Sequence, residues 1–150
     1  MKDREAITIL MADDDPEDVM FAEDALDEAR VANEFYSVGD GEELLEYLER
    51  RGEYSDPKDS PRPGLILLDL NMPRMNGLEA LEKIKSDPKL RSIPVVVLTT
   101  SRAEEDVYKS YDLGVNGFIS KPVSFEGLVE AMQVIGKYWF EIVERPSSSD

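Results

Sequence analysis

Five short apolar runs alternate with amphipathic segments along this 150-residue chain, and this alternation constrains the fold more than any other feature. The runs predict strands at Ile7–Ala12, Asn33–Val38, Leu65–Leu70, Val95–Thr99 and Gly117–Ile119. The third run opens with four large aliphatic residues in succession, a pattern typical of a strand buried on both faces of a parallel sheet. The alternation therefore predicts an α/β fold, a doubly wound five-stranded parallel sheet with helices on both faces.

The amphipathic segments predict the helices and the domain boundaries. Helices are expected at Asp18–Ala29, Gly41–Arg50, Leu78–Lys85, Glu104–Leu113 and Ser124 to about Val143. Asp15 is expected to cap the first helix, with Pro16 at its first position. Arg51–Gly64 interrupts the rhythm with Gly, Pro, Ser and mixed charge, which predicts an elongated surface loop. We expect one domain over residues 1–145 and a polar tail over residues 146–150.

Composition excludes several kinds of chemistry. The chain has no cysteine and no histidine, so it cannot form a disulfide, a His/Cys zinc site or a Ser-His-Asp triad. Its net charge of −16 opposes direct contact with nucleic acid, because binding a polyanion favours basic patches. It shows no signal-peptide core and no apolar stretch near the roughly 20 residues that span a bilayer, so we expect a cytoplasmic protein without membrane contact.

Carboxylates lie at or just after the ends of the first and third expected strands. Asp69 closes an otherwise apolar run, and a carboxylate in that place requires something that offsets its desolvation. Asp13 and Asp14 follow the first strand, where a nucleotide-binding fold would have a glycine-rich phosphate loop. The first and third strands of a doubly wound sheet can be neighbours, which would bring these acids together. Such a cluster favours Mg²⁺, to which the backbone carbonyl of Asn71 could also bind.

Polar residues also follow the fourth and fifth expected strands. Thr99 could donate a hydrogen bond to a phosphoryl oxygen, although hydroxyls at strand ends are also common turn formers. Lys121 lies directly between a buried strand and Pro122, which makes it a better candidate for a fixed cation than an ordinary surface lysine. With the three acids, these residues form a set suited to phosphoryl transfer: metal ligands, the nucleophile Asp69, a hydroxyl donor and a cation.

At these positions the chain resembles the receiver domain of two-component response regulators, over about residues 5–143. The resemblance rests on ILMADD at residues 9–14, LLDLNMPRMNG at 67–77, PVVVLTT at 94–100 and GFISKP at 117–122. It implies a flavodoxin-like fold with strand order 2-1-3-4-5. The insertion at Arg51–Gly64 and the ending KYWFEIV at 137–143 resemble the single-domain regulators associated with bacterial phytochromes.

The resemblance implies a phosphorylation-driven signalling function. Asp69 would accept a phosphoryl group from a phosphohistidine on a sensor histidine kinase, of the phytochrome type in the narrower subgroup. Asp14, Asp69 and the Asn71 carbonyl would coordinate Mg²⁺, with Asp13 acting nearby. Such a domain catalyses only its own phosphotransfer and dephosphorylation, so the protein would not be a conventional enzyme.

The resemblance also assigns the residues around the phosphoryl group. Thr99 and Lys121 would contact the phosphoryl oxygens. Thr99 and Phe118 would form the switch, in which the aromatic ring moves inward as the hydroxyl is drawn to the phosphate. Phe118 lacks the tyrosine hydroxyl, so it would act through packing alone. Asn71 and Ser101 match positions that tune dephosphorylation.

The resemblance leaves the output to a protein contact. No DNA-binding helix-turn-helix follows the expected domain, so a protein target that the sequence does not name would read the signal. The last helix is rich in apolar residues, namely Tyr138, Trp139, Phe140, Ile142 and Val143. Two interpretations stay open for this surface: core packing, or a face for a partner or a homodimer formed through the fourth helix, fifth strand and last helix.

Two other functions compete with the binding switch. A metal-dependent phosphohydrolase of the haloacid-dehalogenase kind could use Asp69 as nucleophile, but it would need a second aspartate where Asn71 stands. A scaffold that works without phosphorylation could retain the pocket as a vestige, although all the key positions are intact. Multiple-turnover hydrolysis of a phosphate monoester would favour the first, and indifference to beryllofluoride with Mg²⁺ would favour the second.

Overall fold

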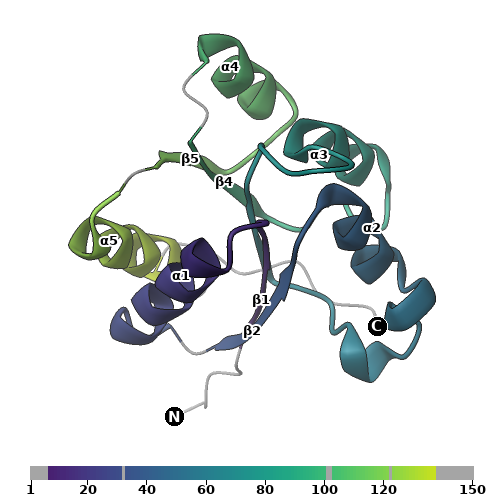
Figure 1. The fold of residues 1–150 in the computed structure, drawn as a ribbon, viewed down its shortest axis with the longest axis horizontal. Helices are drawn as coiled ribbons and strands as arrows, with labels where there is room; N and C mark the ends of the chain where they lie inside the picture. The colour runs from purple at the N-terminus through teal and green to yellow at the C-terminus, as the bar shows by residue number, and fades with distance from the viewer. Residues whose placement is uncertain (1–6, 32, 101–102, 122, 138–150) are drawn as a thin grey trace.

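The computed structural model describes residues 7–31, 33–100, 103–121 and 123–137. A five-stranded parallel sheet in the order β2-β1-β3-β4-β5 lies at the centre, which confirms the predicted fold class and strand order (Figure 1). The strands are β1 (Ile7–Ala12), β2 (Asn33–Val38), β3 (Leu65–Leu68), β4 (Val95–Thr99) and β5 (Gly117–Ser120). Because β1 pairs with both β2 and β3, the ends of β1 and β3 lie side by side.

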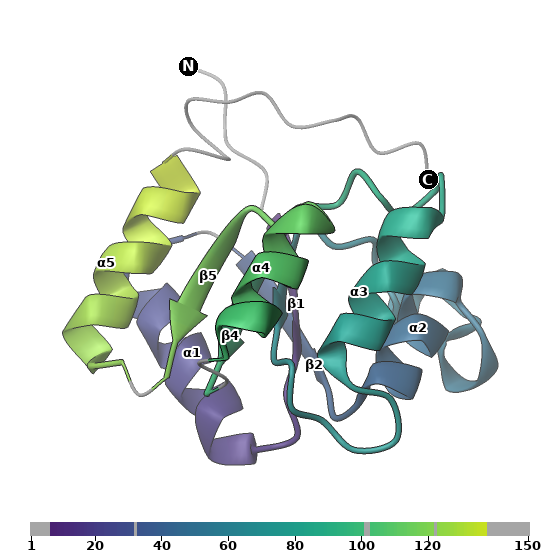
Figure 2. The same ribbon diagram turned by 90° about the horizontal axis from the view of Figure 1, so that it is seen from above.

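Helices cover both faces of the sheet (Figures 1 and 2). They are α1 (Pro16–Glu28), α2 (Gly41–Glu49), α3 (Gly77–Ser86), α4 (Glu104–Asp112) and α5 (Phe125–Gly136). Helices α1 and α5 pack together on one face, whereas α2 and α3 pack together on the other. Helix α4 lies next to α3, near the β5 edge of the sheet (Figure 2).

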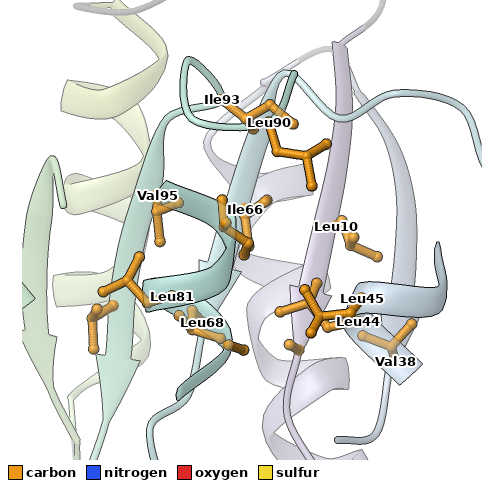
Figure 3. Close-up of a cluster of buried hydrophobic side chains, with 14 of the residues drawn as sticks. Leu10, Val38, Leu44, Leu45, Ile66, Leu68, Leu81, Leu90, Ile93 and Val95 are labelled. Atoms are coloured by element: carbon orange, nitrogen blue, oxygen red, sulfur yellow. The ribbon is translucent and has the colours of Figure 1, made fainter. Parts of the chain in front are cut away.

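Two apolar layers result from the alternation of side chains along the strands. Leu10 and Ile66 point toward α2 and α3, where they join Leu44 and Leu81 in one buried cluster (Figure 3). The neighbouring strand residues Ile9, Leu65 and Leu67 join a second cluster with Leu26 of α1 and Met132 of α5. Because both faces of the central strands are apolar, polar side chains gather at the strand ends.

Side-chain caps set where four of the helices begin. Asp15 caps α1 as predicted, and its carboxylate accepts a hydrogen bond from the Glu17 N–H at 2.9 Å, with Pro16 in the first turn. Asp40, Asn76 and Ser124 cap α2, α3 and α5 in the same way. These caps fix the helix N-termini next to the strand ends, because each helix follows the end of a strand.

The segment Arg51–Gly64 is more structured than the elongated loop that the sequence predicted. It forms two short 3-10 helices, Gly52–Tyr54 and Pro57–Asp59. The hydroxyl of the buried Tyr47 donates to the Pro61 carbonyl at 2.7 Å, and the Ser60 hydroxyl donates to the Tyr54 carbonyl at 2.9 Å. Composition indicated only turn residues and could not reveal that these polar groups satisfy one another.

Some predictions fall outside the described residues. The continuation of the last helix to Val143, its aromatic residues 138–140, the tail at 146–150, and the positions Ser101 and Pro122 all lie there. Where the chain is described, no helix combines the length and the apolar character needed to cross a bilayer.

Candidate functional site

The ends of four strands bring the predicted site residues together. Asp13 follows β1, Asp69 follows β3, Thr99 ends β4 and Lys121 follows β5. All four are buried, with 3%, 6%, 0% and 9% of their surface exposed, respectively. Two carboxylates and one ammonium are thus largely removed from solvent at one end of the sheet. Apolar packing does not account for them, since burying a charge is unfavourable unless it is paired.

Asp13, Asp14 and Asp69 form a carboxylate cluster in which one oxygen of each lies within 4.8 Å of the others. Asp14 is exposed, so the cluster is open to solvent on one side. Burial raises the pKa of Asp13 by more than the hydrogen bonds from Lys121 and the Asp15 N–H lower it. Carboxylate oxygens at this spacing fit a hard divalent cation, whose charge would also relieve the repulsion between them.

Lys121 partly neutralises this cluster. Its Nζ donates to Asp13 Oδ2 at 2.7 Å and to Asp18 Oδ2 at 2.8 Å, and it lies 3.5 Å from Asp69 Oδ2. Burial alone would lower the pKa of Lys121, but the hydrogen bonds to Asp13 and Asp18 outweigh it and raise the pKa above its ordinary value. The ammonium is therefore held in place by three carboxylates.

The other side of Asp69 is held by neutral donors. The Thr99 hydroxyl donates to Asp69 Oδ1 at 2.6 Å, and the Asn71 N–H donates to the same oxygen at 3.1 Å. The Asn71 side-chain amide donates to the Thr100 hydroxyl at 3.2 Å. These contacts fix the orientation of the Asp69 carboxylate, so that Oδ2 faces Lys121.

Strand β3 ends at Leu68, two residues before the predicted Leu70, because the backbone turns toward this site. The Leu70 N–H lies 3.4 Å from the Thr99 hydroxyl oxygen and not in a strand ladder. Gly77 then passes so close that an added Cβ would lie 2.2 Å from the Asp69 carbonyl oxygen. Only glycine fits there, which explains why α3 begins with Gly77 directly after its cap Asn76.

The structure adds two ion pairs that sequence reasoning missed. The sequence placed Asp18 only at the start of the expected helix Asp18–Ala29, yet Asp18 binds Lys121, which is 103 positions away. Asp40 caps α2 and also accepts a hydrogen bond from Arg74 Nε at 3.0 Å, which ties the β3–α3 loop to α2. No sequence spacing signals such contacts. Phe118 is half-buried and packs against the core cluster of α2 and α3, as a packing role requires.

Comparison with known proteins identifies the family. The response regulator receiver domain matches residues 9–133, which include every strand-end residue described above. The chain belongs to this family. Response regulator Rcp1 of Synechocystis sp. (strain PCC 6803) is 40% identical over 140 residues, 93% of this chain and 93% of Rcp1.

Solved receiver domains have the same architecture. The phosphorylated cyanobacterial phytochrome response regulator RcpA is 40% identical, with a TM-score of 0.85 over 95% of this chain and 100% of RcpA. The Mn²⁺-bound form of Rcp1 is also 40% identical, with a TM-score of 0.81 over 94% of this chain and 99% of Rcp1. These matches agree with the predicted resemblance to phytochrome-associated regulators.

Membership in the receiver family has direct consequences. It makes the chain a two-component signalling protein and implies a cognate sensor kinase as its partner. It also agrees with a divalent cation at the acidic pocket of Asp13, Asp14 and Asp69.

Proposed function

We propose that the chain is a phosphoacceptor switch in which Asp69 receives a phosphoryl group from a phosphohistidine on its sensor kinase. The observation that carries this proposal is the pair of contrasting environments around Asp69. On one side, Asp69 Oδ2 faces the buried ammonium of Lys121, which also binds Asp13 of the carboxylate cluster. On the other side, Asp69 Oδ1 accepts a hydrogen bond from the Thr99 hydroxyl. That arrangement suits a carboxylate nucleophile beside a cation, with donors ready for the incoming oxygens.

The transfer forms a P–O bond to an Asp69 oxygen while the P–N bond of the phosphohistidine breaks, and the imidazole leaves with the electron pair. Thr99 and Lys121 then contact the phosphoryl oxygens. Asp13, Asp14, Asp69 and the Asn71 carbonyl would hold Mg²⁺, which would supply positive charge against the charge that develops on phosphorus. Asn71 and Ser101, which match family positions that tune dephosphorylation, would set the lifetime of the phosphoryl group.

The switch follows from the competition for Thr99. Its hydroxyl donates to Asp69 in this structure, and a phosphoryl group adds about −1.5 to −2 charge as a stronger acceptor in the same place. Movement of Thr99 toward that acceptor would open space for the half-buried Phe118. The change would reach the surface through α4, where Tyr108 and Tyr111 are 77% and 52% exposed.

We further propose that the kinase is of the phytochrome type, because the chain is similar to a phytochrome response regulator over nearly its whole length. The proposal extends to a cytoplasmic receiver domain over residues 1–145, with residues 146–150 as a tail. A homodimer through α4, β5 and the last helix would use the exposed tyrosines of α4. Size-exclusion chromatography with and without beryllofluoride tests that dimer.

The function is tested by incubating the protein with acetyl phosphate and following its mass by intact-protein mass spectrometry. We expect a gain of one phosphoryl group that requires Mg²⁺ and is absent in Asp69→Asn. The matched control is Asp24→Asn, which removes an exposed carboxylate on α1, away from the site, and should behave like the wild type. Uptake that Asp69→Asn leaves unchanged would contradict the proposal, and steady turnover of a phosphate monoester would favour the phosphohydrolase.

A further inference from the structure

Asp18 contacts Lys121 without belonging to the carboxylate cluster. Its Oδ2 accepts a hydrogen bond from Lys121 Nζ at 2.8 Å, nearly as short as the 2.7 Å contact with Asp13. The cluster that could hold a cation contains Asp13, Asp14 and Asp69 but not Asp18. Lys121 is therefore shared between an acid of the cation site and an acid outside it.

Asp13 cannot serve Lys121 and a divalent cation independently. Its Oδ1 accepts the Asp15 N–H at 2.9 Å, and its Oδ2 accepts Lys121 at 2.7 Å. A cation bound to Asp13 must approach the same carboxylate as the ammonium, and the two positive charges repel. Asp69, which lies 3.5 Å from Lys121, belongs to the cation cluster as well.

The position of Asp18 is set by packing that does not depend on the cluster. Asp18 lies in the first turn of α1, where a negative charge is favourable. Phe21 of α1 packs edge-on against Phe125 at the start of α5, with ring centroids 5.6 Å apart. The helix that carries Asp18 is thus fixed beside α5.

We propose that Asp18 is a positioning residue that retains Lys121 beside Asp69 when a divalent cation occupies the acid cluster. With Asp18 in place, the ammonium keeps an anionic partner as the cation takes over Asp13. When Asp18 is removed, the carboxylates that remain in described ion-pair contact with Lys121 are Asp13 and Asp69. Both belong to the cluster, so Lys121 and the cation compete for them directly. The metal-binding part stands alone, and the phosphotransfer part rests on the proposed function.

The metal-binding part is tested by isothermal titration calorimetry with Mn²⁺ and with Mg²⁺. We expect Asp18→Asn to raise the Kd for the cation about fivefold, a factor equivalent to about 1 kcal/mol. Glu17→Gln removes a carboxylate from the same helix turn without a described contact to Lys121, and should change the Kd by less than about twofold, as screened surface charges do. Asp18→Glu should restore most of the affinity.

The Lys121→Met background separates positioning from simple loss of charge. If Asp18 acts through Lys121, Asp18→Asn should raise the Kd for the cation in the Lys121→Met background no more than Glu17→Gln does. The inference would be overturned if Asp18→Asn raised the Kd for the cation fivefold in both backgrounds. It would also be overturned if, in the wild type, Asp18→Asn raised the Kd no more than Glu17→Gln does. Urea unfolding of each variant verifies that it is folded before titration.

A second measurement follows the rate of phosphorylation by acetyl phosphate at saturating Mg²⁺. We expect Asp18→Asn to slow it by about threefold or more, because Lys121 is no longer held near Asp69, and Asp18→Glu to recover it. A wild type that binds cation but takes up no phosphoryl group would refute the proposed function alone. Normal uptake, with Asp18→Asn matching Glu17→Gln in both assays, would refute this inference alone.

Discussion

Polar groups find their partners in different ways at the two ends of the sheet. At the end with the insertion, the Tyr47 and Ser60 hydroxyls donate to backbone carbonyls, and Arg62 donates to the Lys89 carbonyl at 2.8 Å. At the other end, Asp13 and Asp69 crowd together, and the charge that offsets them comes from a side chain, Lys121.

This difference separates groups that stabilise the fold from groups that are ready for chemistry. Around the insertion, hydroxyl and guanidinium donors bind backbone carbonyls beside a cleft of about 760 Å³ lined by residues that include Arg50 and Arg62. Replacement of either partner there leaves a polar group without its bond. In the acidic pocket, removal of the Asp13 carboxylate removes the cost of a buried charge and, to a smaller extent, its repulsion with Asp69, so stability and function oppose each other.

The largest expected effect lies at the insertion end. Tyr47 is 1% exposed and packs between Tyr36 and Tyr54, with ring centroids 6.2 and 5.3 Å away. Tyr47→Ala should lower the free energy of unfolding by about 3–5 kcal/mol, because it leaves a large cavity and an unpaired carbonyl. Urea denaturation measures this change, and a loss below about 1 kcal/mol would show that the insertion contributes little.

For Asp13 we expect a substitution that raises the free energy of unfolding. Asp13→Asn should raise the free energy of unfolding of the metal-free protein by about 1–2 kcal/mol at neutral pH. Because the folded-state pKa of Asp13 lies above 3.8, the ionised carboxylate destabilises the folded protein. The wild type therefore loses stability as the pH rises from 3.8 through the folded-state pKa of Asp13. The advantage of the variant should therefore vanish in acid, and unfolding at several pH values in a metal chelator measures it. Equal stability of both proteins at neutral pH would contradict the comparison.

Asp40 lies near the same sheet end but should behave in the reverse way. Burial alone would raise its pKa, yet hydrogen bonds from the Glu43 N–H and Arg74 hold it below the usual range. Its contribution is thus present above pH 3.8 and is lost as pH falls through the folded-state pKa. Asp40→Ala should cost about 1 kcal/mol at neutral pH and less in acid. Thermal unfolding across pH tests this, and a cost that grows in acid would be inconsistent with it.

The smallest expected effect is at Ser60. This residue is 1% exposed, and its hydroxyl bonds the Tyr54 carbonyl. Ser60→Ala should cost about 0.5 kcal/mol, the low end of the net value of one hydrogen bond, with no change in cation affinity. Chemical denaturation and calorimetry of the same sample give both quantities, and a change in cation affinity would break the separation between the two ends.

Much of the site could be predicted because its residues lie at strand ends. Three of them lie at the ends of the buried strands β1, β3 and β4, whereas Lys121 follows β5, which is only half-buried. Runs such as Leu65–Leu68 make the next polar residue stand out, so Asp69 was visible without a structure. Asp18 was not, because its partner Lys121 is 103 positions away and first-turn acids are common on helices. The backbone turn at Leu70 was also hidden, since a hydroxyl on a neighbouring strand takes the place of a ladder partner.

The insertion at Arg51–Gly64 also has a consequence for chain entropy. It lengthens the connection that must close before β3 can pair with β1. Closure entropy grows only logarithmically, so doubling such a connection costs about 0.6 kcal/mol, less than the hydrogen bonds of Tyr47 and Ser60 return. A receiver domain can therefore carry extra chain at this place, far from Asp69, with almost no effect on the equilibrium between folded and unfolded states.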